Sequence, residues 1–332
     1  MFDGFKFKYL LFNFIDWREQ MPFQLYLDFD EINNEIKVKY KYDKSNNISS
    51  ETQTWRGTFE YYNIVVKEVK YNNNKTICYL YITGSLHKNY EKGHNFKRFY
   101  YSDCCKEIKY LSNSLQLDSQ KVEILNLEFG VNIEVDFETY EYLNKHLLSY
   151  KSTQFDRYGK GKGKHIGYYC KLEEYDIKLY DKSLQNGLQH GLMRFEYRIK
   201  EMHDYTNKLG IKTLNDLMDK KLVAKLFNVL IEAWENIYLF EKIDVLELKL
   251  TPTLKKILPN ADNNRYWKNL HKSKPRMYRD YRKIYKEFIQ TYGVNYHAII
   301  RAKVVKEWDC LFDSVSSIFG VMVKSENRRS IN

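Results

Sequence analysis

The sequence predicts an α+β protein in which an antiparallel sheet with flanking helices precedes a mostly helical C-terminal region. Three observations lead to this prediction. Apolar and polar residues alternate in several segments before residue 200, apolar residues recur at helical spacing after it, and no long linker rich in proline, glycine and serine interrupts the chain. We place the two predicted regions at 1–205 and 206–332, where the period changes.

The first half of the chain has the pattern of strands separated by turns. A helix is expected over 102–115, because Ser102 and Asp103 are good helix-starting residues. Asparagine-rich breaks at 45–49 and 72–74 are typical of turns. The expected strands lie at 4–15, 23–29, 35–43, near 58–70 and at 77–83.

Three later segments show the clearest strand pattern. In segment 124–135 the odd positions are apolar and the even positions from 126 on are polar or glycine, and a helix is expected after it over 137–149. In 175–182 and 192–200, one face is apolar and the other is polar. The predicted core positions of the first strand are Leu125, Leu127, Phe129, Val131, Ile133 and Val135. The predicted polar faces of the other two are Asp176, Lys178, Tyr180 and Lys182, and Arg194, Glu196, Arg198 and Lys200.

Helical spacing dominates the rest of the chain, at 213–242 and 295–320. Between them, the stretch 265–287 interleaves basic residues with tyrosine and tryptophan. Stacking on these rings together with phosphate contacts would suit single-stranded or melted DNA. The alternative is a helix with a buried aromatic stripe and a solvated basic face.

Composition restricts the class of partner and the compartment. A net charge of +11 over 332 residues favours a polyanionic partner, a nucleic acid or a membrane surface. No apolar run approaches the roughly 18 residues of a membrane span, so we expect no membrane insertion. Five cysteines without a Cys-x-x-Cys pair indicate neither a zinc site nor a disulfide framework, and the N-terminus lacks a signal-peptide core. These features predict a reducing, cytoplasmic location.

The polar faces of the three strands suggest a reactive site. If the strands lie side by side, Glu128, Tyr180 and Glu196 converge on one surface. Two carboxylates there would suit a hard divalent ion such as Mg²⁺, beside which a tyrosine could attack a phosphodiester. Lys178, Lys182, Arg194 and Arg198 would then contact the DNA backbone or the transition-state charge. The alternative is an ordinary outward face, with Glu196 in a charge ladder with its arginine neighbours.

Several motifs resemble known proteins. The segment Gly-Leu-Met-Arg-Phe-Glu-Tyr-Arg-Ile-Lys at 191–200, followed by Leu-Gly-Ile at 209–211 and Leu-Asn-Asp-Leu at 214–217, resembles the filamentous-phage gene II replication proteins, which nick one strand of phage DNA. Ile-Lys-Leu-Tyr-Asp-Lys at 177–182 is similar to their strand with the nicking tyrosine, and to the Tyr-Asp-Lys motif of plasmid initiators and related relaxases.

Shorter motifs extend this resemblance over roughly 1–220, with a looser match near 265–295. Leu-Glu-Phe-Gly-Val-Asn at 127–132 lies where the family has an acidic residue in an alternating strand. The other segments are Gly-Ser-Leu-His-Lys at 84–88, Gly-His-Asn-Phe at 93–96 and the opening Met-Phe-Asp at 1–3. The order and spacing of the motifs are more specific than any one of them.

The resemblance implies roles for individual residues. Tyr180 corresponds to the nucleophile with Lys182 beside it, and Glu128 and Glu196 to ligands of Mg²⁺ or Mn²⁺. Asp3 is a further candidate ligand, although in a regular strand it would lie on the same side as Phe5 and Phe7 and so point toward the core. The chain has no His-hydrophobic-His pair, so the metal site would be rich in carboxylates.

Two further groups are candidate DNA contacts, each with a structural alternative. His87 and His94 are either metal or phosphate contacts or hydrogen-bonded structural residues. The loop around 159–167 lacks a nucleotide-binding ending and is either a basic loop over DNA or a solvated turn. Its candidate DNA-binding residues are Lys160, Lys162 and Lys164.

The function that the resemblance implies is initiation of rolling-circle replication of a phage or plasmid. The protein would nick one strand at an origin through a 5′-phosphotyrosine intermediate and religate it after one round. Its expected partners are single-stranded or melted origin DNA and the helicase and polymerase of a bacterial host. The alternatives are a conjugative relaxase with the same chemistry and a DNA-binding protein without catalysis. The oligomeric state is not predicted.

Overall fold

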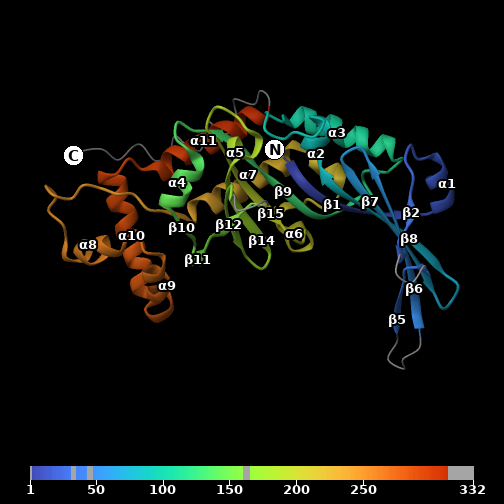
Figure 1. The fold of residues 1–332 in the computed structure, drawn as a ribbon, viewed down its shortest axis with the longest axis horizontal. Helices are drawn as coiled ribbons and strands as arrows, with labels where there is room; N and C mark the ends of the chain where they lie inside the picture. The colour runs from blue at the N-terminus through green and yellow to red at the C-terminus, as the bar shows by residue number, and fades with distance from the viewer. Residues whose placement is uncertain (1, 31–34, 43–47, 160–164, 313–332) are drawn as a thin grey trace. The chain divides into compact units, whose positions relative to one another are not determined.

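The structure is a computed structural model that describes residues 2–30, 35–42, 48–159 and 165–312 (Figure 1). The chain forms two compact units. Among the described residues, unit 1 lies within 2–129, 198–226 and 311–312, and unit 2 lies within 130–197 and 227–310. The chain passes between them four times, within the strands β9 (Glu123–Glu134) and β15 (Leu192–Ile199) and within two helices, at 226–227 and 310–311. The units are therefore interleaved in sequence, unlike the division into 1–205 and 206–332.

Unit 1 is built on an antiparallel sheet. Its strands lie in the order β9-β1-β8-β7-β6-β2, and β5 pairs with β6. Only the first part of β9 belongs to this unit. The bounds are β1 (Phe2–Leu11), β2 (Tyr26–Leu27), β5 (Val38–Tyr42), β6 (Ile48–Phe59), β7 (Tyr62–Tyr71) and β8 (Thr76–Ser85), with a separate pair of β3 (Phe29–Asp30) and β4 (Glu35–Ile36).

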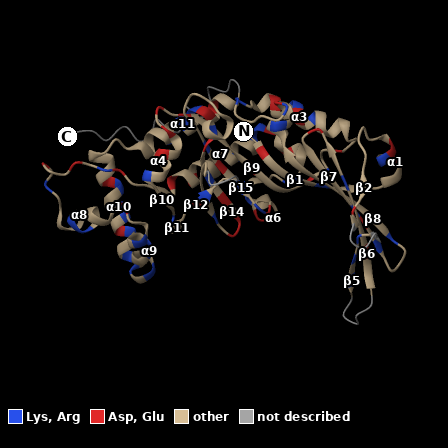
Figure 2. Ribbon diagram, viewed as in Figure 1, with Lys and Arg blue, Asp and Glu red and all other residues tan. Residues whose placement is uncertain are grey.

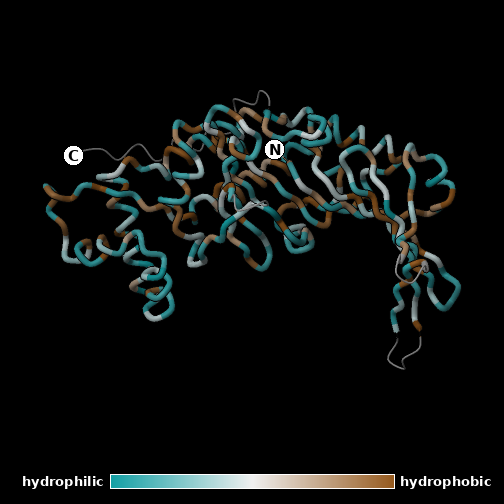
Figure 3. Tube along the Cα trace, viewed as in Figure 1, coloured by the Kyte–Doolittle hydropathy of each residue, from teal (hydrophilic) through white to brown (hydrophobic). Residues whose placement is uncertain are grey.

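One side of this sheet carries the core of unit 1. Hydrophobic and hydrophilic positions alternate along its strands (Figure 3), and Phe7, Ile64 and Leu80 are fully buried. Helices α2 and α3 cover that side (Figure 1), with the phenol of Tyr62 donating to Glu107 on α3. The helices of unit 1 are α1 (Phe14–Gln20), α2 (Leu86–Tyr90), α3 (Tyr101–Ser114), α6 (His203–Leu209), the 3-10 helix η1 (Leu214–Met218) and the start of α7 (Lys220–Glu235).

Unit 2 combines a sheet with most of the C-terminal helices. Its strands lie in the order β12-β13-β14-β15, and β15 pairs with the second part of β9. A second sheet has the order β11-β10-β16. The bounds are β10 (Leu147–Tyr150), β11 (Thr153–Gln154), β12 (Asp156–Tyr158), β13 (Gly167–Lys171), β14 (Tyr175–Asp181) and β16 (Ile237–Leu239).

The helical part of unit 2 has its own hydrophobic cluster. Trp267, Tyr278, Tyr285 and Phe288 are buried there together. The indole of Trp267 donates to the carbonyl of Ala261, so its polar atom is satisfied. The helices are α4 (Thr139–His146), α5 (Lys182–Asn186), the rest of α7, α8 (Pro252–Ile257), the 3-10 helix η2 (Leu258–Asn260), α9 (Asn264–Ser273), α10 (Pro275–Tyr292) and α11 (Tyr296–Leu311).

These elements confirm the predicted α+β class, the large antiparallel sheet and the mainly helical content after residue 200. Five segment predictions were wrong in detail. The helical spacing predicted at 213–242 includes the strand β16, because α7 ends at Glu235, and the strand predicted at 23–29 is reduced to β2 and the first residue of β3. The strand expected at 4–15 ends at Leu11, because Asn13 caps α1. The strand expected near 58–70 is two strands, with Glu60 turning the chain between them at φ 50°. The helix expected over 137–149 ends at His146, where β10 begins. The last helix ends at Leu311, and most of its expected extension to 320 lies outside the described residues.

One predicted core position differs for a geometric reason. Leu127, Phe129, Val131, Ile133 and Val135 are buried as expected, but Leu125 is only partly buried. The pairing of β9 with β1 jumps from Asn126 opposite Lys6 to Ile124 opposite Phe7, leaving Leu125 as an extra residue. This bulge reverses the parity, so Ile124 enters the core instead.

Candidate active site

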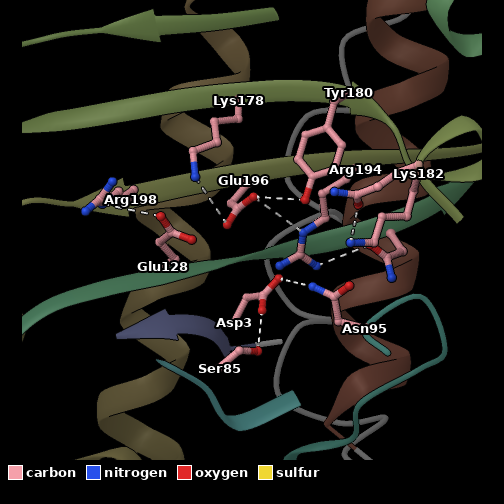
Figure 4. Close-up of polar contacts among 12 residues, drawn as sticks. Asp3, Ser85, Asn95, Glu128, Lys178, Tyr180, Lys182, Arg194, Glu196 and Arg198 are labelled. Carbon is pink, nitrogen blue, oxygen red and sulfur yellow. Dashed lines mark hydrogen bonds and ion pairs between the residues drawn. The ribbon is translucent and has the colours of Figure 1, made fainter. Parts of the chain in front are cut away.

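Tyr180 lies near the end of β14, inside unit 2. Its side chain is only 3% exposed, and its hydroxyl donates to Oε2 of Glu196 on β15 at 3.3 Å (Figure 4). Gly167 on β13 faces it, where an added Cβ would lie 2.4 Å from the Cα of Tyr180. The absence of a side chain at Gly167 therefore lets the two strands approach closely at this tyrosine.

Glu196 is the centre of a buried charged group. The Lys178 ammonium lies 3.9 Å from Oε1, and the Arg194 Nε lies 4.0 Å from Oε2. Arg194 and Glu196 are each 2% exposed, and Arg194 also donates to Asn132 at 3.4 Å. Removing one partner of such a buried ion pair leaves an uncompensated charge, which costs about 3–5 kcal/mol. The group therefore holds the carboxylate beside the phenol in one arrangement.

Lys182 does not continue the polar face of the strand, as the alternation had predicted. β14 ends at Asp181, whose carboxylate caps α5 by accepting from the backbone N–H of Leu184 at 2.8 Å. Lys182 is the first residue of that helix and is 1% exposed. Its ammonium donates to Gln185 at 2.9 Å and lies 5.4 Å from the centre of the Tyr180 ring. The positive charge remains next to the candidate nucleophile, but the helix places it there.

Glu128 lies in unit 1, where it pairs with Arg198. The Nε of Arg198 lies 3.3 Å from Oε1 of Glu128 (Figure 4), and the arginine side chain is 41% exposed. An added Cβ at Gly4 would lie 2.6 Å from Oε2, so this glycine leaves room for the carboxylate. Tyr180 and Glu196 belong to unit 2, so their meeting with Glu128 stays a prediction.

Asp3 is buried within unit 1, as its parity indicated, and it connects three motifs of the resemblance. Ser85 donates to Oδ1, and the Asn95 amide donates to Oδ2 at 2.7 Å (Figure 4). Ser85 also caps α2 by accepting from the backbone N–H of Lys88. Sequence reasoning did not single out Ser85 or Asn95, although both stand in segments quoted for the resemblance. Alternation cannot reveal them, because the contacts join residues 82 and 92 positions apart.

The two candidate histidines have different environments. His87 is 2% exposed and stacks on Phe99, with ring centres 4.8 Å apart and planes 7° apart. This burial favours the structural alternative for His87. His94 is exposed and meets the ring of Phe96 edge-on at 5.4 Å. Lys160, Lys162 and Lys164 lie outside the described residues.

The basic stretch 265–287 forms α9 and α10. Trp267, Tyr278 and Tyr285 are buried in the hydrophobic cluster, so the prediction that bases stack on these three rings is wrong. The alternative of a buried aromatic stripe is confirmed for them. Basic residues lie along both helices (Figure 2), and the exposed ones are Arg265, Lys268, Lys272, Lys274, Arg276, Arg279, Lys283 and Lys286.

The candidate metal ligands already have partners. Asp3 accepts two hydrogen bonds, Glu128 pairs with an arginine, and Glu196 pairs with a lysine and an arginine. Across the described residues, no group of three or more histidine, cysteine, aspartate or glutamate side chains is arranged to hold a metal ion. In this arrangement the carboxylates therefore do not fit a divalent ion unless they exchange those partners.

Comparison with known proteins gives no match to a protein family, a curated protein or a solved structure. Within the described part of the chain, no helix has both the length and the apolar character needed to cross a membrane.

Proposed function

We propose that this protein nicks and rejoins one strand of DNA with Tyr180 as the nucleophile, and that it initiates rolling-circle replication of a phage or plasmid. The observation that carries the proposal is the hydrogen bond from the Tyr180 phenol to the buried Glu196 carboxylate, between Lys178 and Arg194. A phenol is a weak nucleophile until a neighbouring base accepts its proton, and a carboxylate at this distance can do so.

The proposed step is a transfer of a phosphodiester to the tyrosine. The phenol oxygen of Tyr180 bonds to phosphorus while its proton passes to Glu196, and the bond from phosphorus to the 3′ oxygen breaks. The 3′ oxygen takes a proton from water, and the hydroxide that remains takes the proton held by Glu196, which leaves a 5′-phosphotyrosine and a free 3′-hydroxyl for a host polymerase. Lys178 and Arg194 lie beside Glu196, where they would stabilise negative charge that develops during the transfer. Attack by a 3′-hydroxyl reverses these steps and rejoins the strand.

The burial of Tyr180 adds a requirement to this proposal. A reacting phosphorus has to come within about 3–3.5 Å of the attacking oxygen. Tyr180 is 3% exposed, so the side chain has to become more accessible when DNA binds.

No step above uses a metal ion, because the carboxylates are paired in this arrangement. A requirement for Mg²⁺ or Mn²⁺ stays a prediction of the family resemblance, as do the cytoplasmic location in a bacterial host and the helicase partner. The adduct assay below tests the metal directly, by comparing EDTA with each of the two ions.

The experiment is to incubate the protein with DNA of the replicon that encodes it and to look for a covalent adduct on a denaturing gel. The wild type should form an adduct and Tyr180→Phe should form none. Tyr175→Phe on the same strand is the matched control and should react like the wild type. An adduct that persists in Tyr180→Phe would exclude Tyr180 as the nucleophile.

The same geometry favours one other function. A buried carboxylate with two cations is also a purely structural ion pair, which is what a DNA-binding protein without catalysis would retain. Absence of an adduct on every DNA of that replicon, with EDTA and with either ion, would support this second function.

A further inference from the structure

Strands β1, β8 and β7 of unit 1 form a sheet whose two sides differ sharply. On the inner side, Phe7, Ile64, Val66, Leu80 and Ile82 are no more than 1% exposed. On the outer side, the strand pairing brings a second set of residues together, and none of them is buried. We name this set the tyrosine–lysine face; it consists of Lys6, Lys8, Lys67, Tyr79 and Tyr81.

Lysine side chains surround the two aromatic rings of this face. The Lys8 ammonium lies 4.6 Å from the ring centre of Tyr79. The ammonium groups of Lys6 and Lys67 lie 5.3 and 5.2 Å from the ring centre of Tyr81. In the described part of the chain, none of these three lysines forms an ion pair with a carboxylate. Glu123 of β9 lies opposite Lys8 in the strand pairing but outside ion-pair distance, so the three lysines keep a net positive charge for a partner.

The end of the face at Lys6 opens on a hollow of about 540 Å³, which also lies in unit 1. Lys200, Lys212 and His203 line it together with Lys6, and two carboxylates, Glu123 and Glu201, lie on its wall. Three lysines against two glutamates leave the hollow with a net positive charge, which makes it a continuation of the basic face. A polyanion on the face could extend into it.

We propose that the tyrosine–lysine face binds single-stranded DNA, with bases stacked on Tyr79 and Tyr81 and phosphates bound by the lysines around them. Aromatic rings on an open sheet provide stacking surfaces, and the three lysines neutralise the backbone. A duplex keeps its bases stacked on each other, so it cannot use the rings. The choice of DNA as the nucleic acid rests on the proposed function, which needs an unpaired strand at a nick site.

The binding test uses a fluorescent oligothymidylate of about 20 nucleotides and measures anisotropy with the full chain. Tyr79→Leu and Tyr81→Leu keep apolar bulk on the strand but remove the aromatic face. Each should weaken binding about tenfold, whereas Tyr79→Phe and Tyr81→Phe should bind within about twofold of the wild type. Tyr40→Leu on β5 is the matched control, because Tyr40 is an exposed strand tyrosine of the same unit, and it should have no effect.

Salt dependence tests the lysines separately. The triple variant of Lys6→Gln, Lys8→Gln and Lys67→Gln should lower the slope of log affinity against log salt by about 2, since each phosphate contact on a single strand contributes about 0.7. Loss of slope in the lysine variant without any effect of the tyrosine-to-leucine variants would indicate a general polyanion surface and would overturn the stacking. Equal weakening of a blunt duplex by Tyr81→Leu would overturn the preference for unpaired bases.

The outcome also separates this inference from the nicking chemistry. Tyr180→Phe should keep oligothymidylate binding while losing the adduct. If the tyrosine-to-leucine changes weaken binding but no DNA forms an adduct, the result supports DNA binding by the tyrosine–lysine face and contradicts nicking by Tyr180. If the adduct forms and both tyrosine-to-leucine variants bind like the wild type, the result supports nicking by Tyr180 and contradicts DNA binding by the tyrosine–lysine face. Thermal unfolding of each variant identifies any loss of binding that comes from misfolding.

Discussion

The two units place tyrosines of alternating strands in opposite environments. Tyr180 in unit 2 is 3% exposed and hydrogen-bonded to a buried carboxylate, whereas Tyr79 and Tyr81 in unit 1 lie on an open side with lysines over their rings. Nearly every residue of β15 is buried on both sides, so the polar face of that strand is an interior network. The buried setting suits reaction at one atom, and the open setting suits binding of many bases.

The largest effect is expected when each of the two kinds of tyrosine variant is measured in both the adduct assay and the binding assay. Tyr180→Phe should abolish the covalent adduct, since no hydroxyl remains to attack, and should leave single-strand binding within about twofold. Tyr81→Leu should weaken binding about tenfold but leave the adduct detectable at saturating DNA. Adduct yield and anisotropy, measured on the same preparations, check both. Parallel loss of both activities in either variant would contradict the separation of roles.

The next effect concerns the stability of the two ion pairs. Glu196→Ala should lower the free energy of unfolding by about 3–5 kcal/mol, because it leaves buried Arg194 without its counter-charge. Glu128→Ala is the matched control and should cost no more than about 1 kcal/mol, because its partner Arg198 is 41% exposed. Urea unfolding at neutral pH measures both. Equal losses would contradict the claim that the Glu196 group is an interior network.

The sequence predicted the strands of both sites better than it predicted their environment. Alternation identified β14 and β15 and set Tyr180 and Glu196 on one face, and the structure brings these two residues into hydrogen-bond contact. It could not show that this face is buried, because a period of two separates faces without saying what covers them. For the same reason, it gave no signal that Tyr79 and Tyr81 share an open face with lysines of another strand.

Other differences come from local geometry and from long-range contacts. The bulge at Leu125 depends on pairing with β1, which the residues of β9 alone do not reveal. Lys182 left the strand face because Asp181 caps a short helix, a signal that the alternation obscured. The contacts of Asp3 with Ser85 and Asn95 join distant segments, so only the fold brings them together.

A smaller effect should test how tightly the chain packs at the buried tyrosine. Gly167→Ala should cost about 3 kcal/mol, because its Cβ would lie 2.4 Å from the Cα and Cβ of Tyr180 and would force the strands apart. Gly187→Ala, at a φ of 67° with open space around it, should cost only about 1 kcal/mol. Unfolding midpoints of the two variants check the difference. Similar costs would mean that the Tyr180 environment is loosely packed.

The smallest expected effect is a pH dependence of folding stability caused by a second buried carboxylate, Glu107 of unit 1, whose surroundings differ from those of Glu196. Glu107 is 5% exposed and accepts from the Tyr62 phenol and the Asn89 amide, both at 2.7 Å, which are neutral donors. Burial raises the pKa of Glu107, and these two hydrogen bonds only partly oppose the shift. The folded protein therefore holds this proton at a pH where the unfolded chain has already released it.

It follows that Glu107 makes the folded state less stable as pH rises from the ordinary pKa of a glutamate through its raised value. Glu107→Gln removes this titration and keeps an acceptor for Tyr62. We expect the urea midpoint of the wild type to fall relative to that of Glu107→Gln between a pH of about 4 and about 7. A difference that is constant over this range, or that moves in favour of the wild type as pH rises, would show that Glu107 is stabilised in its charged form.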